Sequence, residues 1–452
     1  GAMLCARAYG WLASEDTAHA LLHLTIGAAC GVLIYRFKFS RVANKNIRRI
    51  SRLAERANPL AFQSPPTYLL IAFMMGLGIA LRQSALPRYL LAILYLGIGL
   101  GRDMRLTAPE LAARYRAGMI AEGAHVMDAG QVGTEMLYYL VGSRDLDGGL
   151  MCTASHNPKA YTGAKLVRRG ALALSGEEGI NDIRDLIEAG LGDAPGGGSA
   201  EDVDVAAGFR DKVKEFIDVR KVKPLKVVVD GGNGMAGPMV GPILEELDLD
   251  LITSYWKPNG NFPDHEPNPL LPENREFIIK KVKAEGADLG IAWDGDADRC
   301  FFIDDTGRFI DGDFMTALLA ESLLGKATQP ETILYDARAS RAVADTVERA
   351  GGKAEINRVG HAFFKGRMRR EGSMFGGEVS GHYYFRDFYC ADSGTIPALL
   401  MLELISERGV KLSELLEPYR STYFISGEIN SEVDDAPAKI AEIEATYADG
   451  TI

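Results

Sequence analysis

The sequence predicts a protein of successive α/β domains with mixed or mostly parallel sheets, preceded by an all-α hydrophobic region. From about residue 101, short apolar strands alternate with amphipathic helices, which is the pattern of α/β layers. The charge is also divided, because residues 1–101 carry a formal charge of +8 and residues 102–452 carry −19. The length of 452 residues corresponds to about three or four compact units.

The composition excludes several other classes. With 47% hydrophobic and 25% charged residues, the chain is neither collagen-like nor intrinsically disordered. Its five cysteines stand far apart without a Cys-x-x-Cys pair. This spacing favours a reducing compartment over a disulfide framework or a zinc site.

Three apolar runs mark the first hundred residues, at Ala18–Tyr35, Tyr68–Leu81 and Tyr89–Leu100. Eight lysines and arginines lie between the first two runs, as in a cytoplasmic loop. A bilayer-spanning helix needs about 20 apolar residues, so we predict that residues 1–100 form a membrane-associated helical region. The alternative is a soluble bundle of buried helices. The third run is short and equally compatible with a buried parallel strand.

The expected elements of the remaining chain follow in order. A capping box at Thr107–Glu110 begins a helix. The elements expected next are strands at 124–128 and 149–153 around a helix at 134–141, a flexible linker or loop at 190–199, a strand at 225–229, a helix ending near 247, strands at 287–293 and 332–335, a helix at 340–350, a strand at 354–357 and a helix at 393–407.

The first motif that carries chemistry is Thr153–Pro158 (Thr-Ala-Ser-His-Asn-Pro). It places Ser155 and His156 at the carboxyl end of a strand, where α/β sheets bind ligands. Lys165 follows ten residues later. The alternatives are a simple Asn-Pro turn and a surface lysine.

The second motif contains Asp294, Asp296 and Asp298 directly after the apolar segment Leu289–Trp293. Three carboxylates at this spacing offer oxygen ligands to a hard cation such as Mg²⁺. A solvated charge run is the alternative, and the preceding apolar strand argues against it. An EF-hand is disfavoured because no glutamate stands at the twelfth position of the loop.

The third motif is Gly376–His382, in which Glu378, Ser380 and His382 alternate. In an extended segment these three side chains point to one side and suit sugar hydroxyl groups. A polar edge strand is the alternative. Upstream, the pair Gly360-His361, with Lys365, begins a helix whose amino end is a candidate anion site, the alternative being a helix start with a solvated histidine.

Together these motifs resemble the α-D-phosphohexomutase family, and within it most closely the bacterial phosphomannomutase/phosphoglucomutase group. Thr153–Pro158 resembles the family's phosphoserine loop, Asp294–Arg299 its metal loop and Gly377–His382 its sugar-binding loop. Gly101–Arg105 also matches a strand end of the family. The order and spacing agree across about residues 95–452.

The resemblance implies an intramolecular phosphotransferase that interconverts hexose 6-phosphate and hexose 1-phosphate, with mannose or glucose as the sugar. Ser155 would carry the phosphate, and Ser155, Asp294, Asp296 and Asp298 would hold one Mg²⁺. A hexose 1,6-bisphosphate would be the intermediate and activator. The implied partners are hexose phosphates, with no nucleic acid.

The resemblance also implies roles for the surrounding residues. Lys165 and His382 are both candidates for proton transfer, beside His156 in the catalytic group. The implied phosphate environment contains Arg299, Asn157 and Arg102. The implied substrate-binding residues are Glu378, Ser380, His382, Arg338, His361 and Gly360.

The expected domains are 1–100, a membrane-associated region; 101–205, an incomplete domain 1; 206–309, domain 2; 310–420, domain 3; and 421–452, a fragment of domain 4. The family's amino-terminal Gly-Thr-Ser-Gly-Ile-Arg-Gly-like segment and its distal phosphate loop are not found, so impaired activity is expected. The alternatives are an inactive sugar-phosphate-binding protein, a membrane-anchored interaction protein and a fusion or assembly artefact. The implied location is a cytoplasmic catalytic body attached to the inner membrane.

Overall fold

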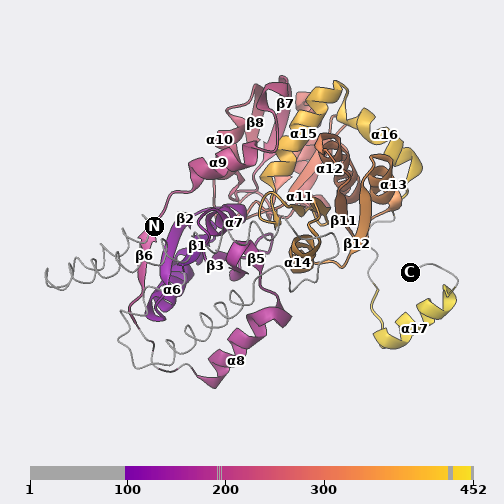
Figure 1. Cartoon of the computed structure of the whole chain (residues 1–452). Coiled ribbons are helices and arrows are strands. Elements are labelled where there is room, and N and C mark those ends of the chain that lie inside the picture. The colour runs from indigo at the N-terminus through magenta and orange to yellow at the C-terminus, as the bar shows by residue number, and fades with distance from the viewer. Residues whose placement is uncertain (1–96, 191, 193, 195, 426–430, 449–452) are drawn as a thin grey trace, which may run out of the picture. The chain divides into compact units, whose positions relative to one another are not determined.

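A computed structural model describes residues 97–190, 192, 194, 196–425 and 431–448 (Figure 1). Most of the predicted membrane-associated region lies outside these residues. Within the described part, no helix combines the length and the apolar character that a bilayer crossing requires. The end of the third apolar run is described, and it forms a strand, Gly97–Arg102. The strand interpretation is therefore correct for that end of the run.

The first sheet contains six described strands in the order β5-β4-β3-β1-β2-β6. Strand β1 pairs in parallel with both β2 and β3, and β4 runs antiparallel to β3. The strands are β1 (Gly97–Arg102), β2 (His125–Gln131), β3 (Gly148–Thr153), β4 (Gly163–Arg168), β5 (Leu172–Ala173) and β6 (Ser199–Asp202).

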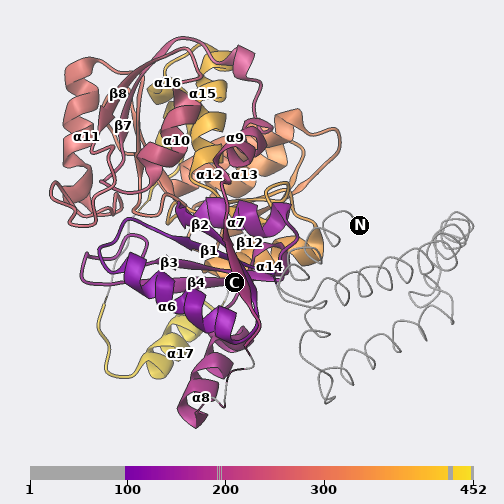
Figure 2. The ribbon, with the colours of Figure 1, turned by 90° about the vertical axis from the view of Figure 1, so that its left-hand side faces the viewer.

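Two helices cover opposite faces of this sheet, α6 (Ala108–Ala121) and α7 (Thr134–Ser143) (Figure 2). Helix α7 lies very close to the sheet because β1 has glycines on the facing side. A Cβ atom on Gly99 would lie 3.2–3.3 Å from side chains of α7. Small residues in β1 therefore fix the distance between α7 and the sheet, and α7 begins next to the site described below.

The second sheet has four described strands in the order β10-β9-β7-β8, with only β10 antiparallel to its neighbour. Alternate residues of β7 face opposite sides. Val227 and Val229 pack with α10, whereas Val228 packs with α11. The elements are β7 (Leu225–Asp230), α10 (Ala236–Leu244), β8 (Leu249–Ser254), α11 (Pro272–Glu285), β9 (Leu289–Trp293) and β10 (Cys300–Asp304).

The third sheet has five described strands in the order β12-β11-β13-β14-β15. Strands β13 and β14 form an antiparallel hairpin, and β14 pairs with β15. The elements are α12 (Gly312–Lys326), β11 (Thr332–Asp336), α13 (Arg341–Arg349), β12 (Lys353–Asn357), α14 (His361–Glu371), β13 (Phe375–Gly377), β14 (Tyr383–Phe385) and β15 (Ala391–Asp392).

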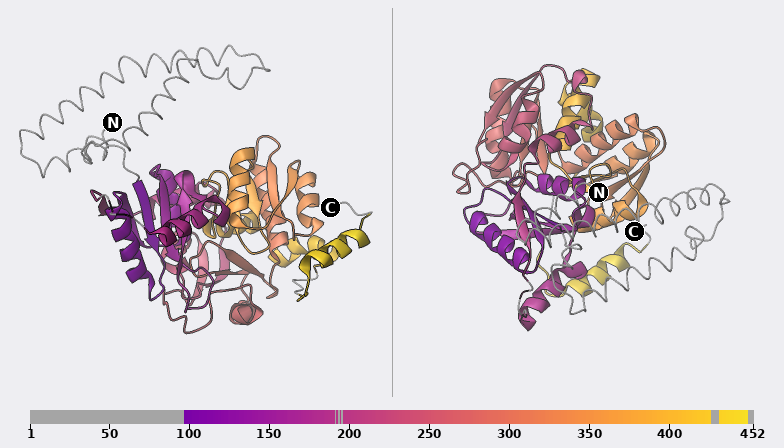
Figure 3. Two further views of the ribbon diagram at one scale, coloured as in Figure 1. Left: turned by 90° about the horizontal axis from the view of Figure 1, so that it is seen from below. Right: turned by 60° about the vertical axis from the view of Figure 1, so that its left-hand side comes forward.

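One hydrophobic cluster continues from the first sheet to the third. It includes Leu137 of α7, Ile291 of β9, Phe375 of β13 and Leu399 of α15, all fully buried. Figure 3 shows the first and third sheets at opposite ends of this arrangement in its left panel. The remaining helices are α8 (Asn181–Ala189), α9 (Ala206–Lys214), α15 (Thr395–Arg408), α16 (Leu412–Thr422) and α17 (Ala436–Thr446).

The predicted capping box is wrong. Thr107 precedes α6 in a helical backbone conformation and makes no side-chain cap. Its hydroxyl instead lies 2.6 Å from that of Thr162, while Glu110 accepts hydrogen bonds from Arg114. The segment expected as a linker at 190–199 leads directly into β6, which extends the first sheet beside β2.

Candidate active site

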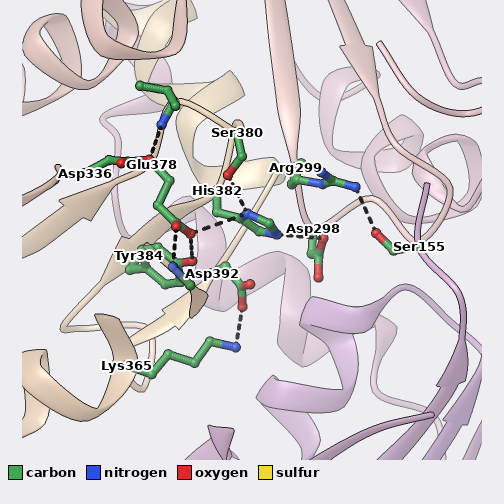
Figure 4. Close-up of polar contacts among 12 residues, drawn as sticks. Ser155, Asp298, Arg299, Asp336, Lys365, Glu378, Ser380, His382, Tyr384 and Asp392 are labelled. Atoms are coloured by element: carbon green, nitrogen blue, oxygen red, sulfur yellow. Dashed lines mark hydrogen bonds and ion pairs between the residues drawn. The ribbon is translucent and has the colours of Figure 1, made fainter. Parts of the chain in front are cut away.

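Ser155 lies two residues beyond the end of β3, with a backbone φ of 52°. This left-handed conformation is uncommon for a residue with a side chain, and such strain concentrates at functional sites. The Ser155 amide donates to Thr153 Oγ1 at 2.9 Å. Its hydroxyl donates to Asp294 Oδ2 at 2.6 Å. The same hydroxyl accepts from Arg299 Nη2 at 3.1 Å (Figure 4). The serine of the first motif therefore directly contacts the loop of the second.

A buried arginine that the sequence analysis did not select holds the serine loop in place. The guanidinium of Arg105 donates to the backbone carbonyls of Ser155, Asn157, Pro158 and Tyr161 at 2.6–3.0 Å. Only 1% of Arg105 is exposed, and Asp103 pairs with it. A guanidinium group has five N–H donors in one plane, so it can hydrogen-bond to several carbonyl oxygens at once.

Arg105 contacts the serine loop, whereas the place of Arg102 near a phosphate stays a prediction. The side chain of Arg102 lies beside Gly130, since a Cβ on that glycine would be 3.9 Å from Arg102 Nη1. Both arginines belong to the segment Gly101–Arg105, so the segment was the right signal. Asn157 contributes its backbone carbonyl to the contact with Arg105, and its predicted place in the phosphate environment stays a prediction.

The three aspartates of the second motif follow β9 and are completely buried. One carboxylate oxygen of each lies within 4.8 Å of the others. Asp296 Oδ1 and Asp298 Oδ1 have no hydrogen-bond partner among the described residues. Buried carboxylate oxygens seldom stay unpaired, so this group of oxygens fits a hard divalent cation.

Lys165 on β4 reaches the same carboxylates. Its Nζ lies 2.8 Å from Asp296 Oδ2 and also donates to Asp298 Oδ2. Burial alone would lower the pKa of Lys165, but the two carboxylates outweigh burial and raise it. Burial, followed by the charge of Asp296, raises the pKa of Asp298. The positive charge of Lys165 thus offsets the negative charges of Asp296 and Asp298.

Arg299 and His156 complete the surroundings of the serine. Arg299 Nε donates to Asp294 Oδ2 at 2.9 Å, and its Nη2 also contacts His156 Nδ1. Burial and the adjacent guanidinium lower the pKa of His156. His156 is therefore a neutral acceptor at neutral pH.

The third motif was predicted to be extended, and this prediction is wrong. The motif forms the turn of the β13–β14 hairpin. The Glu378 amide donates to the His382 carbonyl at 2.9 Å, and the Gly381 amide donates to the Glu378 carbonyl at 3.1 Å. Gly381 has a φ of 85°, and a Cβ there would lie 2.6 Å from the ring of Phe301. The tight turn still brings the side chains together, with Ser380 Oγ 3.1 Å from His382 Nδ1 (Figure 4).

Glu378 connects this hairpin to the start of α14. Its carboxylate accepts from the Gly360 amide at 2.9 Å and from the Tyr384 hydroxyl. Burial raises the pKa of Glu378. The adjacent His361 stacks on His382 with ring centroids 6.4 Å apart, and burial, then Lys365, lower the pKa of His361 to about 4.

Arg338 and Lys365, which the sequence also suggested for the site, each form an ion pair with an aspartate. Arg338 forms an ion pair with Asp336 at 2.6 Å, and Asp336 accepts from the Val379 amide at 3.3 Å. Arg338 is thus connected to the hairpin through Asp336. Lys365 is fully buried with its Nζ 2.6 Å from Asp392 Oδ1, so its charge faces the interior rather than an anion at the start of α14 (Figure 4).

The residues of the serine and metal loops approach those of the hairpin where Asp298 lies near His382. His382 Nε2 of the hairpin lies 4.0 Å from Asp298 Oδ1 of the metal loop. The serine loop, the acidic loop and the hairpin therefore form a single polar site at the strand ends of three sheets. Such a site can accept a phosphate beside Ser155 and a polyhydroxylated ligand beside Glu378 and Ser380.

Comparisons with known proteins agree with this arrangement. Family models described as phosphoglucomutase/phosphomannomutase α/β/α domains I, II and III match residues 85–191, 207–307 and 311–423. The "Phosphohexose mutases" protein of Xanthomonas campestris pv. campestris is 45% identical over 353 residues, 77% of this chain and 78% of the relative. The phosphomannomutase of Salmonella montevideo is 42% identical over 361 residues, 78% and 79% of the two chains.

A solved structure adds a comparison of folds. The crystal structure of a phosphoglucomutase/phosphomannomutase family protein from Burkholderia thailandensis has a TM-score of 0.67 at 32% identity, covering 74% of this chain and 72% of that one. Fold, site and relatives define an isomerase of the mutase type acting on hexose phosphates. This chain belongs to the phosphoglucomutase/phosphomannomutase family, the predicted α-D-phosphohexomutase family, close to the bacterial phosphomannomutases.

Proposed function

We propose that this mutase interconverts the 6-phosphate and the 1-phosphate of mannose or glucose through a phosphate carried on Ser155. The observation that carries the proposal is the contact of Ser155 with both Asp294 and Arg299. The Ser155 hydroxyl thus lies beside a carboxylate of the candidate metal-binding group and beside the guanidinium of Arg299. The printed names of the relatives, phosphomannomutase and phosphohexose mutases, support hexose phosphates as substrates.

The proposed metal is Mg²⁺, held by Asp294, Asp296 and Asp298 together with an oxygen on Ser155. The residues fit this metal, because their donor atoms are all oxygens and two of these oxygens, Asp296 Oδ1 and Asp298 Oδ1, accept no hydrogen bond from the described residues. When bound, Mg²⁺ would neutralise charge on the transferring phosphoryl group. Around it, Arg299 orients Ser155, and Thr134 donates a hydrogen bond to Asp296 that fixes this carboxylate.

The phosphoryl group leaves Ser155 Oγ as it bonds to a sugar oxygen. The sugar hydroxyl loses its proton, and the released serine oxygen gains one. Lys165 and His382 are the two candidates for these transfers, and they lie near different carboxylate oxygens of Asp298. The resulting hexose 1,6-bisphosphate turns in the site, so that its other phosphate returns to Ser155.

Sugar recognition is assigned to the hairpin. Glu378 and Ser380 would bind sugar hydroxyl groups that are available in both orientations of the bisphosphate. Gly360 and His361 at the start of α14 and Arg338 beyond β11 would line the same side. Gly360 and Asp336 hydrogen-bond to the hairpin from outside, and within it Tyr384 donates to Glu378.

The test follows conversion of glucose 1-phosphate to glucose 6-phosphate and phosphate incorporation into the protein, using glucose 1,6-bisphosphate and Mg²⁺. We expect Ser155→Ala to abolish both, whereas Ser421→Ala on the exposed side of α16 should leave both unchanged. Labelling that persists in Ser155→Ala would place the nucleophile elsewhere. Binding of sugar phosphate without any turnover by the unaltered chain would support the inactive alternative.

A further inference from the structure

One face of helix α7 is directed toward the third sheet. Glu135, Tyr138 and Gly142 are spaced three and four residues apart and share this face. The ring of Tyr138 lies 3.9 Å from Lys365 Nζ, measured to the ring centroid. A side chain at Gly142 would collide with the ring of Tyr389. Helix α7, which covers the first sheet, thus contacts residues around the third sheet through this face, next to the site.

Glu135 makes the polar contacts of this face. Its carboxyl accepts from the hydroxyls of Ser393 and Thr395, the latter at 2.5 Å, and Glu135 is fully buried. Ser393 Oγ also accepts from the amides of Thr395 and Ile396 at 3.2 and 3.0 Å. Because these two amides use its lone pairs, the Ser393 hydroxyl hydrogen is left for Glu135.

The segment that Glu135 holds is connected to both halves of the site. The Ser393 amide donates to the Tyr383 carbonyl at 3.0 Å, one residue beyond His382. The Gly394 carbonyl accepts from Trp293 Nε1 at 3.0 Å, and a Cβ on Gly394 would lie 2.5 Å from the Ala297 carbonyl of the metal loop.

The residue before Glu135 contacts the metal loop as well. Thr134 donates through its hydroxyl to the carboxylate of Asp296, and its amide donates to the Asp296 carbonyl at 3.1 Å. The first turn of α7 therefore touches the metal loop through one residue and the segment behind the sugar hairpin through the next.

We infer that Glu135 is a positioning residue that sets the sugar-binding hairpin at its working distance from the serine and metal loops. The inference rests on the proposed function for its effect on turnover. Its physical basis is that reacting groups must be held within a fraction of an ångström, so a small displacement lowers the rate steeply. Burial also raises the pKa of Glu135 to about 8, so the carboxyl is protonated at pH 7. Glutamine is likewise uncharged, and it can accept from Ser393 through its amide oxygen and donate to the Thr395 hydroxyl through its amide nitrogen.

The kinetic test compares Glu135→Ala, Glu135→Gln and the control Glu122→Gln, which alters an exposed glutamate beside α6. With glucose 1-phosphate, we expect kcat of Glu135→Ala to fall by about 10- to 100-fold. Half-saturation by Mg²⁺ should stay within about twofold. Glu135→Gln should retain kcat within about threefold, and Glu122→Gln should match the unaltered protein. Glu135→Ala with full kcat, or Glu135→Gln as impaired as the alanine variant, would overturn the inference.

A second measurement needs no turnover and separates this inference from the proposed function. Hydrogen exchange of the full chain should become faster in Glu135→Ala over residues 378–395, while β7 and β9 stay protected as before. Thr395→Val added to Glu135→Ala should change the exchange little further, because the one described hydrogen bond of the Thr395 hydroxyl is to Glu135. Unchanged exchange over 378–395, or an equal increase throughout the described sheets, would contradict a positioning role.

Discussion

The ammonium nitrogen of Lys165 lies 2.8 Å from Asp296 Oδ2, within the group of carboxylates proposed to hold the metal. A lysine there neutralises charge that would otherwise be buried without a partner. It also competes with a cation for the same oxygens, and in the reaction it is one of two candidates for proton transfer. These two roles predict opposite effects on metal binding and on turnover.

We predict that Lys165→Met tightens Mg²⁺ binding by about tenfold, which corresponds to about 1.4 kcal/mol. The same variant should lower kcat by at least about 100-fold, because a positioned proton donor is lost. Calorimetric titration with Mg²⁺ and the coupled mutase assay measure the two effects. Weaker Mg²⁺ binding in Lys165→Met would show that the lysine supports the cation rather than competing with it.

Arg105 provides a second prediction, since it holds the serine loop through four carbonyls. Arg105→Lys should lower both the midpoint of thermal unfolding and the rate of phosphate incorporation at Ser155, because an ammonium group cannot reproduce the planar fork. The expected destabilisation is about 2–4 kcal/mol, given the worth of hydrogen bonds to a charged group. Arg114→Lys, on the exposed side of α6, is the control and should change neither quantity.

Metal dependence provides a third prediction. Chelation should abolish turnover, and Mg²⁺ at 100 times its Kd should stabilise the folded protein by about 2.7 kcal/mol. Asp298→Asn should remove most of this stabilisation, because it replaces one of three buried carboxylates. Scanning calorimetry with and without Mg²⁺ measures it. An undiminished Mg²⁺ shift in Asp298→Asn would move the metal away from this loop.

The hairpin turn provides a fourth prediction. Gly381→Ala places a side chain at a positive φ and against the Phe301 ring, so the turn must shift. We expect KM for glucose 1-phosphate to rise by about tenfold, since Ser380 and His382 flank the altered residue. Phosphate incorporation at Ser155 from bisphosphate should decrease alongside it. Gly118→Ala, at an open position of α6, should behave as the unaltered protein.

The pKa of Glu135 predicts how stability depends on pH. The folded protein binds this proton up to about pH 8, whereas an unfolded glutamate releases it near pH 4.5. Between these values the folded state holds more protons, so this group's contribution to stability falls as pH rises. It is fully present below about pH 4.5 and lost above about pH 8. Asp392 is the charged residue that acts on the same carboxyl, and its charge raises the pKa of Glu135 further.

Unfolding midpoints between pH 5 and 9 test this dependence. The downward slope should be smaller in Glu135→Gln than in the unaltered protein, with the difference greatest at about pH 6–7. Parallel slopes in the two proteins would show that another group titrates there. Glu122→Gln again controls for a change of charge at the surface.

Local sequence was sufficient for much of the fold and for the chemical character of the loops. Val227, Val228 and Val229 are apolar in succession because both faces of β7 are covered, so a strand was recognisable without its neighbours. Asp294, Asp296 and Asp298 follow such a strand, and their chemistry depends on their spacing alone.

What the sequence could not provide depends on contacts between distant segments. Arg105 precedes its carbonyl partners by about 50 residues, and Glu135 contacts residues about 260 positions away. The alternation of Glu378, Ser380 and His382 fits a strand as well as a turn. Only the pairing of β13 with β14 and the positive φ of Gly381 decide between them.

The hydrophobic cluster shared by the three sheets has a consequence for the proposed catalytic cycle. A hinge motion between these sheets would expose apolar side chains such as Leu137 and Leu399 to water. The free-energy cost would be about 25 cal/mol for each Å² of apolar surface exposed. In the proposed cycle the three sheets would therefore keep their places relative to one another. The bisphosphate itself would reorient, so that each of its phosphates reaches Ser155 in turn.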